Sequence, residues 1–247
     1  MKILVCISSV PDTTSKINFT ADKTAFDKNG IQWVINPLDE FALTKAIKLQ
    51  ANGATVTVLN VGDASTEAVI RKALAIGAND AIRINNEPKD SFSVAKEIAN
   101  VAKDGNYDLI LCGKESIDYN GGSVPGMVAQ LLDQPFVNAC VGLEINGTEA
   151  TAVREIEGGK ETISVKLPAV IAGQKGMVDE KDLIIPNMRG IMSARTKPLQ
   201  VVEPSSTEVR VEAVSYDSVP ARAAVKMISP DNLDELVRLL HEEAKVI

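Results

Sequence analysis

The sequence predicts an α/β fold built on a mostly parallel, doubly wound sheet. Short apolar runs rich in β-branched residues occur at 3–7, 55–61, 81–84 and 109–112, and segments with a helical pattern of apolar residues lie between them. Strands that are buried on both faces have this composition, and crossover helices join them into parallel sheets. We therefore expect helices on both faces of one central sheet.

The first helix has a clear start and end in the sequence. It is expected over 38–51, with Asn36 as its cap and Pro37 at its first helical position. Gly53 stands just past its last turn, where glycine often ends a helix. This segment is predicted to pack its apolar face on the sheet.

Two further helical patterns follow along the chain. They cover 66–76 and 91–102. The connection 85–90 before the second of them is short, polar and free of glycine. It predicts an ordinary turn into a helix that is capped near Asp90 or Ser91.

The pattern changes after residue 132. Two apolar runs, 150–156 and 161–165, are joined by Gly158 and Gly159. They predict an antiparallel hairpin, which makes the sheet mixed.

The last part of the chain predicts an arm. Residues 201–228 are punctuated by proline and serine and have no strong period. A final helix is expected from Pro230, with Ser229 as its cap. We therefore divide the chain into a main domain, 1–200, and a C-terminal arm and helix, 201–247.

Composition excludes several classes of protein. The 247 residues carry a net charge of -7 with no basic stripe, so nucleic acid is not an expected partner. No apolar stretch approaches the roughly 20 residues that span a bilayer, and the opening MKILVCISSVPD predicts a buried strand and not a signal peptide. Cys6, Cys112 and Cys140 stand singly in apolar runs, which predicts reduced thiols in a cytoplasmic protein.

Common catalytic motifs are absent from the sequence. Ser8, Ser9 and Val10 follow the first strand where a glycine-rich dinucleotide fingerprint would stand, and there is no P-loop. The one histidine, His241, is expected on the surface of the last helix, so a Ser-His-Asp triad cannot be assembled. We expect a protein without hydrolytic or transferase chemistry of its own and without a metal site.

One loop has the features of a binding site. The segment GKESIDYNGGSVPG, residues 113–126, follows a buried strand and leads into a fourth helix that is expected to start near Ser123. Ligands of open parallel sheets bind at the carboxyl ends of strands. Gly121 and Gly122 are expected to allow a tight bend, and the amides of Gly122, Ser123 and Val124 would favour a phosphate at the helix N-terminus. The alternative is an ordinary strand-to-helix turn.

Two other features belong to the same predicted edge. Lys114 would supply a positive charge beside that phosphate. The residues 36–39 also open a helix after a short apolar run, 31–35. A plain helix cap explains Asn36 and Pro37 but does not explain why two helix N-termini would flank one sheet edge.

Seven segments together resemble the β subunit of electron transfer flavoproteins, across essentially the whole chain. In chain order they are KILVCIS with Val10, Pro11 and Asp12, INPLDEFAL at 35–43, RKALAIGAND at 71–80, GKESID at 113–118, REIEGGKET at 154–162, LPAVI at 167–171 and IPNMRGIMSARTKPL at 185–199. Each is weak alone, whereas all seven in order are specific.

The resemblance implies an adenine-nucleotide α-hydrolase type of fold that has lost hydrolysis and holds AMP structurally. FAD in this family is held mainly by a separate α subunit, with its flavin ring facing positions that match Thr13 and Leu38. Carried over position by position, the AMP contacts fall on Cys6, Asn36, Pro37, Leu38, Asp39, Val61, Gly113, Lys114, Asn120, Gly121, Gly122, Ser123 and Val124.

The resemblance also implies partners. The chain is expected to form a heterodimer with the α subunit, with the segment 201–247 packing on that subunit. Ile184, Ile185 and Pro186 match the loop that recognises redox partners. Electrons would come from dehydrogenases, such as the acyl-CoA dehydrogenases of fatty acid β-oxidation, and pass to a respiratory quinone oxidoreductase or another acceptor.

Three alternatives stay open at this point. A stand-alone nucleotide-binding stress protein shares the broad fold and a similar phosphate loop, but it lacks the hairpin and the tail. An adenylating ligase would need a pyrophosphate-binding motif after the first strand. An electron-bifurcating flavoprotein would hold a second FAD in place of AMP and would have a longer, glycine-containing connection than the one at 85–90.

Overall fold

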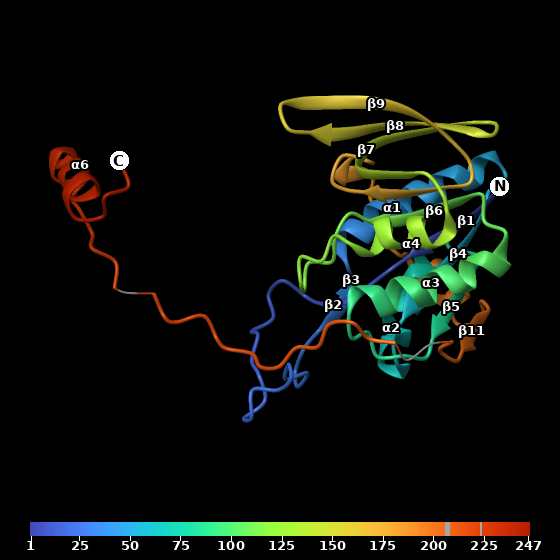
Figure 1. Ribbon diagram of the computed structural model, residues 1–247, viewed down its shortest axis with the longest axis horizontal. Helices are drawn as coiled ribbons and strands as arrows, with labels where there is room; N and C mark the ends of the chain where they lie inside the picture. The colour runs from blue at the N-terminus through green and yellow to red at the C-terminus, as the bar shows by residue number, and fades with distance from the viewer. Residues whose placement is uncertain (206–207, 223) are drawn as a thin grey trace. The chain divides into compact units, whose positions relative to one another are not determined.

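A computed structural model describes residues 1–205, 208–222 and 224–247. The described chain divides into two compact units (Figure 1). One comprises Met1–Ile17 with Asp27–Val214, and the other comprises Asn18–Phe26 with Ser215–Ile247. The domain boundary at residue 200 stays a prediction.

The first unit is built on a nine-stranded sheet. Its strands are parallel from β11 through β5, β4, β1, β6 and β10 to β7, and antiparallel from β7 through β8 to β9. The bounds in spatial order are β11 Leu199–Val202, β5 Asp80–Ile84, β4 Thr55–Val61, β1 Lys2–Cys6, β6 Leu109–Gly113, β10 Ala169–Gly173, β7 Phe136–Asn146, β8 Glu149–Ile156 and β9 Gly159–Lys166.

The four strands expected in the first half are confirmed, and so is the hairpin of β8 and β9. Three strands of this sheet were not predicted, namely β7, β10 and β11. β11 includes Val201 and Val202, which pair with Arg83 and Ile84 of β5 although the sequence assigned them to the arm. Such pairings join segments far apart in the chain, so no local pattern reveals them.

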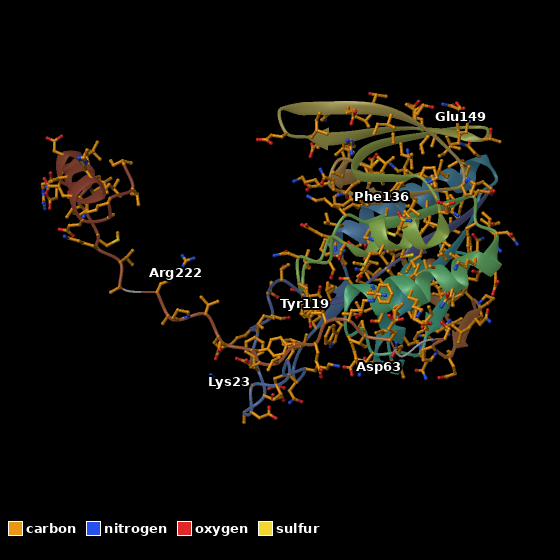
Figure 2. The ribbon with its side chains drawn as sticks, viewed as in Figure 1. Lys23, Asp63, Tyr119, Phe136, Glu149 and Arg222 are labelled. Carbon is orange, nitrogen blue, oxygen red and sulfur yellow. The ribbon has the colours of Figure 1, made fainter. Side chains whose placement is uncertain are left out.

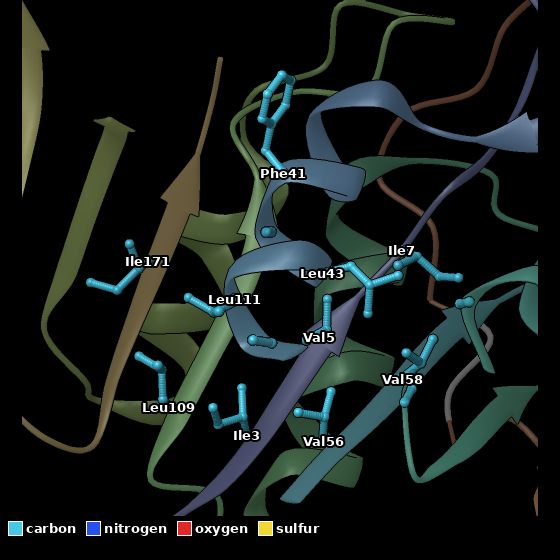
Figure 3. Packing of buried hydrophobic residues seen from close by; sticks show 14 of the residues in the cluster. Ile3, Val5, Ile7, Phe41, Leu43, Val56, Val58, Leu109, Leu111 and Ile171 are labelled. Atoms are coloured by element: carbon cyan, nitrogen blue, oxygen red, sulfur yellow. The ribbon is translucent and has the colours of Figure 1, made fainter. Parts of the chain in front are cut away.

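Helices cover both faces of the sheet, as expected. On one face, α1 (Pro37–Leu49) and α2 (Glu67–Ile76) pack on a cluster that includes Ile3, Val5 and Leu111 (Figure 3). On the other face, α3 (Ser91–Gly105) and α4 (Val124–Leu132) lie side by side over a second buried cluster (Figure 1). Because side chains alternate along a strand, neighbours such as Val5 and Cys6 enter opposite clusters.

The ends of the helices follow the expected chemistry in part. Asp90 caps α3 with a full capping box, in which its side chain accepts a hydrogen bond from the amide of Ser93 at 2.8 Å. α1 ends earlier than predicted, at Leu49, and continues as the 3-10 turn Gln50–Asn52 before Gly53 adopts a left-handed conformation with φ 80°.

Short elements complete this unit. β2 (Ser9–Pro11) pairs with β3 (Trp33–Ile35) in a small antiparallel sheet directly before α1. The 3-10 turns η2 (Ala64–Thr66) and η3 (Glu180–Asp182) and the short helix α5 (Met188–Ala194) lie in connections. α5 is capped by Asn187, whose side chain accepts a hydrogen bond from the amide of Gly190.

The second unit holds the last helix, α6 (Leu233–Glu242). The predicted start at Pro230 with a Ser229 cap is wrong. The side chain of Asn232 accepts the hydrogen bond from the amide of Glu235 and caps the helix, whereas the hydroxyl of Ser229 accepts from the amide of Asp231 in a local turn. His241 is exposed on this helix, as expected.

The rest of the second unit is largely irregular. The rings of Phe19 and Tyr216 stack with their centroids 5.0 Å apart, and Lys23 forms an ion pair with Asp217 at 2.7 Å. Across the residues that the structure describes, no helix combines the length and apolar character needed to cross a membrane.

Candidate functional site

The candidate site lies where the direction of the sheet reverses. From β1 the chain proceeds outward to β4 and β5, and it then returns to place β6 on the other side of β1. In open parallel sheets the crevice at such a reversal, outside the carboxyl ends of the strands, is where ligands bind. The first residues of α1 and the loop after β6 both stand at this edge.

The carboxylate of Asp39 joins the two strands at the reversal. Its Oδ2 accepts a hydrogen bond from the amide of Ser8, just past β1, at 2.7 Å, and its Oδ1 accepts one from the amide of Gly113, at the end of β6, also at 2.7 Å. Asp39 is only 4% exposed. It therefore connects α1, β1 and β6 from a buried position.

Burial changes the acidity of this group. Removal from water raises the pKa of Asp39 to about 7 from its ordinary 3.8, although the hydrogen bonds from Ser8 and Gly113 act in the opposite direction. The carboxyl group therefore titrates near neutral pH in the folded chain.

Asn36 performs a similar joining function and does not cap its own helix. Its Nδ2 donates to the carbonyl of Glu115 at 2.8 Å, and its Oδ1 accepts from the amide of Ile117 at 3.3 Å. No side-chain cap is formed at α1. Asn36 thus stands at the predicted N-cap position, but its side chain satisfies backbone groups of the loop after β6 instead of the helix.

That loop is closed by its own contacts. The amide of Ser116 donates to the carbonyl of Gly121 at 3.3 Å, and the amide of Lys114 donates to the carbonyl of Gly173 in β10 at 2.7 Å. Tyr119 lies in the loop and is 72% exposed (Figure 2). The left-handed residue of the bend is Asn120, with φ 49°.

The expected role of the glycine pair is therefore corrected. Neither Gly121 nor Gly122 has a positive φ. A Cβ added at Gly122 would lie in ordinary contact with the carbonyl oxygen of Lys114 at 3.5 Å. The absence of a side chain at Gly122 is thus not required by the fold of this chain.

The start of α4 presents free backbone donors, as predicted. The amides of Gly122 and Ser123 make no hydrogen bond within the described residues, and both residues are exposed. Val124 is the first helical residue, so its amide also lacks a partner inside the helix. Three such amides at the positive end of a nine-residue helix favour an anion.

A cavity of about 460 Å³ lies beside this loop. Of the predicted contacts, Leu38 and Lys114 line it. Cys6 and Val61 belong to the buried cluster under α3 and α4, and Asn36 and Asp39 use their side chains on the protein backbone. The residues that line the cavity are Leu38, Lys114, Glu115, Glu155, Gln174 and Lys175.

Several residues at this edge were not found from the sequence. Ser8 was considered only as the absence of a glycine motif, yet its amide holds Asp39. Gln174 and Lys175 line the cavity because β10 pairs with β6 and brings Gly173 beside Gly113, and Glu155 reaches it from β8, where it accepts a hydrogen bond from Gln174. The pairing of β10 was not predicted, so no signal in the sequence pointed to these side chains.

The predicted partner loop divides into a buried and an exposed part. Ile184 packs against the main core, and its amide lies 3.4 Å from the hydroxyl of Thr44. Ile185 is 83% exposed, and Met188 on the following helix is 73% exposed. Within the described residues, no group of three or more metal-ligating side chains is present.

Comparison with known proteins identifies the class to which this fold and edge belong. A model of the electron transfer flavoprotein domain matches residues 23–207. The chain is 35% identical to the electron transfer flavoprotein subunit beta of Bacillus subtilis, with both chains covered in full. It is 36% identical to the subunit of the same name in Syntrophomonas wolfei, covering 91% of this chain and 88% of that one.

The human electron transfer flavoprotein subunit beta is 29% identical, over the whole of this chain and 99% of its own. The chain belongs to the electron transfer flavoprotein β-subunit family. Membership implies a role in electron transfer, a flavin in the assembled protein and an α subunit as partner.

Proposed function

We propose that this chain is the AMP-holding subunit of a heterodimeric electron carrier. The chain binds AMP without turning it over, and the α subunit holds FAD. The complex accepts electrons from flavin dehydrogenases, such as acyl-CoA dehydrogenases, and passes them to a quinone oxidoreductase or a similar acceptor. The cytoplasm is the proposed location, although the relative from Oryza sativa subsp. japonica carries the name mitochondrial.

The observation that carries the nucleotide proposal is the start of α4. Its exposed amides at Gly122 and Ser123 have no protein partner among the described residues and stand next to the carboxyl end of β6. A single phosphate would satisfy these donors, and Lys114 lies in the same loop to add positive charge. Turnover is not proposed, because both oxygens of the buried Asp39 carboxylate already accept hydrogen bonds from backbone amides.

Nucleotide analysis tests this proposal directly. The purified heterodimer is denatured by heat, and the supernatant is analysed for adenine nucleotides and flavin. We expect about one AMP for each β subunit, and release of ATP that is hydrolysed during incubation would contradict the proposal.

A pair of variants at one residue sharpens the test. Gly122→Asp places a carboxylate where the phosphate is proposed and is expected to abolish AMP retention, because like charges repel. Gly122→Ala is the matched control for the fold, since a Cβ there meets only ordinary contacts. Equal AMP content in the wild type and the Asp variant would remove the loop from the proposed site.

The proposed docking surface for redox partners is inferred from the solvent exposure of its apolar side chains. We propose that Ile185, together with Met188, Ile191 and Met192, forms the surface that docks a dehydrogenase. These side chains are 83%, 73%, 41% and 58% exposed, and neighbouring exposed aliphatic side chains commonly mark an interface.

Substitution separates docking from core packing. Ile185→Ala is expected to slow reduction by an acyl-CoA dehydrogenase with unchanged Tm and AMP content. Ile184→Ala is the matched comparison, because Ile184 packs against the core and its loss is expected to lower Tm. Unchanged electron transfer in Ile185→Ala would exclude this residue from the docking surface.

The segment 201–247 is proposed to pack on the α subunit. Leu233 and Val237 of α6 are 63% and 55% exposed, which leaves an apolar face for a partner to cover. Deletion of 229–247 is expected to weaken heterodimer formation, measured by co-purification of the two subunits.

One specific observation favours the one-flavin carrier over the bifurcating alternative. The connection between β5 and α3 contains only residues 85–90, of which Asp90 already caps the helix. Little backbone is left to make room for a second flavin. Counting cofactors after gentle purification decides between them, because two FAD and no AMP would favour the bifurcating reading.

A further inference from the structure

Two cysteines end adjacent strands at the reversal of the sheet. Cys6 is the last residue of β1, and Cys112 is the last but one of β6. β1 and β6 are parallel neighbours, with Val5 opposite Leu111. One residue further along both strands, Cys6 therefore stands beside Cys112.

The two side chains project from the same face of the sheet. Cys6 and Cys112 both belong to the cluster under α3 and α4, whereas Val5 and Leu111 belong to the cluster on the opposite face. Neighbouring strands lie about 4.8 Å apart, which falls within the range of about 4.4 to 6.8 Å between the Cα atoms of a disulfide. The backbone thus brings these thiols within bonding reach.

The chemistry of the pair agrees with this placement. A side-chain hydrogen bond with Cys6, followed by burial, raises the pKa of the Cys112 thiol well above its ordinary value. The two sulfur atoms therefore interact already in the reduced chain. Both cysteines are free thiols, 7% and 4% exposed.

We propose that Cys6 and Cys112 form a redox-active dithiol that closes to a disulfide within the chain when hydrogen peroxide reaches the crevice. The Cys6 thiolate attacks one peroxide oxygen, the O–O bond breaks, and the departing hydroxide takes a proton to become water. The Cys112 sulfur then attacks Cys6 Sγ, the S–O bond breaks, and a second water leaves with the Cys112 proton. The two thiols lose two electrons in total, and one peroxide is reduced to two waters.

Cys6 is the first nucleophile for positional reasons. It is the last residue of β1, two residues before Ser8, whose amide bonds Asp39 at the crevice, and it is slightly more exposed than Cys112. The contact with Cys6 and burial raise the pKa of the Cys112 thiol, so Cys112 is the less reactive of the two and is left as the second nucleophile.

The third cysteine provides an internal control. Cys140 lies on β7, which β10 separates from β6, and its Sγ donates to the carbonyl of Gly142 at 3.1 Å. It belongs to the cluster on the opposite face of the sheet. Cys140 therefore cannot reach either member of the pair without unfolding.

The dithiol has a consequence that rests on the proposed function. Cys6 is one of the expected AMP contacts, so bound AMP would cover the thiol that meets peroxide first. Only the AMP-free chain would then react, and AMP at about ten times its Kd is expected to slow disulfide formation about tenfold.

The test uses the full-length chain. The reduced chain is treated with peroxide, remaining thiols are blocked with an alkylating reagent, and the protein is digested with trypsin without reduction. Cys6 falls in the peptide 3–16, Cys112 in 104–114 and Cys140 in 115–154. We expect a linked pair of 3–16 with 104–114, and a fall from three titratable thiols to one.

Variants and AMP define the remaining outcomes. The Cys140→Ser variant is expected to form the same linked peptides. The Cys6→Ser variant is expected to form no linked peptides. Three free thiols in a wild-type sample whose methionines are oxidised would overturn the proposal, as would a link that involves Cys140. If AMP binds without slowing disulfide formation, AMP does not cover Cys6. If AMP does not bind at all, the proposed function is wrong, and the linked peptides still show whether the disulfide between Cys6 and Cys112 forms.

Discussion

The Oδ1 atom of Asp39 accepts a hydrogen bond of 2.7 Å from the amide of Gly113, and a Cβ added at Gly113 would lie 2.3 Å from that same oxygen. The carboxylate therefore occupies the space that any larger residue at position 113 would need. The other oxygen of Asp39 holds the amide of Ser8. The sheet edge where the site is proposed thus depends on a buried acid fitted against a glycine.

Gly113→Ala is expected to destabilise the chain by about 1 to 3 kcal/mol, because overpacking at a buried site forces its neighbours to move. The added Cβ would meet the Asp39 amide nitrogen at 2.9 Å as well as the carboxylate. Denaturation by urea measures the change. Gly122→Ala in the same loop is the control and is expected to change stability by less than about 0.5 kcal/mol; equal losses in both variants would contradict the special role of Gly113.

The acidity of Asp39 predicts a dependence of stability on pH. The pKa of Asp39 is about 7 in the folded chain and 3.8 in the unfolded one, so the folded chain binds more protons between these values. Its contribution to the free energy of unfolding therefore falls as pH rises through this window and is flat above it. Between about pH 5 and about pH 7.5 the expected fall is about 2.5 kcal/mol.

Comparison with Asp39→Asn isolates that contribution, since all other titrating groups are shared. The difference in unfolding free energy between wild type and variant is measured at both pH values. A difference that stays constant would show that the two amide hydrogen bonds keep the pKa of Asp39 near its ordinary value.

Asn36→Ala is expected to cost about 1 to 3 kcal/mol, because it leaves partly buried backbone groups of Glu115 and Ile117 without the partner that Asn36 supplies. The loop after β6 should also open more often, which hydrogen exchange of the Ile117 amide would detect. Asn29→Ala removes an exposed side chain bonded only to Asp27 and serves as the control. Unchanged exchange at Ile117 would mean that the loop is held by its own contacts.

Asp90 joins the start of α3 to a later segment, and its removal should expose that segment. One carboxylate oxygen accepts from the amides of Arg210 at 2.7 Å and Val211 at 3.0 Å, and the other caps the helix. Asp90→Ala is expected to speed tryptic cleavage after Arg210, and the loss of the cap costs about 1 kcal/mol. Cleavage after Arg222 in the same digest is the internal reference; a parallel rise at both sites would indicate general unfolding instead.

Local sequence determined most elements of this protein because their signals are short-range. The strand Thr55–Val61 was predicted to the residue, and the third helix, expected to be capped near Asp90 or Ser91, is capped by Asp90. The loop 113–126 was predicted to bind a ligand from its glycines and its place after a buried strand, and its exposed amides at Gly122 and Ser123 are the feature on which that proposal now rests. Helix and strand propensity, helix caps and the spacing of apolar residues can each be recognised within a short segment of sequence.

The tertiary structure alone decided how these pieces meet. Asn36 was read as a cap from its neighbours in sequence, yet its amide bonds residues about eighty positions away, and Asp39 was expected to face the nucleotide but holds Ser8 and Gly113. The pairing of β10 with β6 and the contact of Cys6 with Cys112 follow from strand order, which no local pattern contains. A buried polar group takes whatever partner the fold brings to it, because leaving it unsatisfied costs more than any local preference can offset.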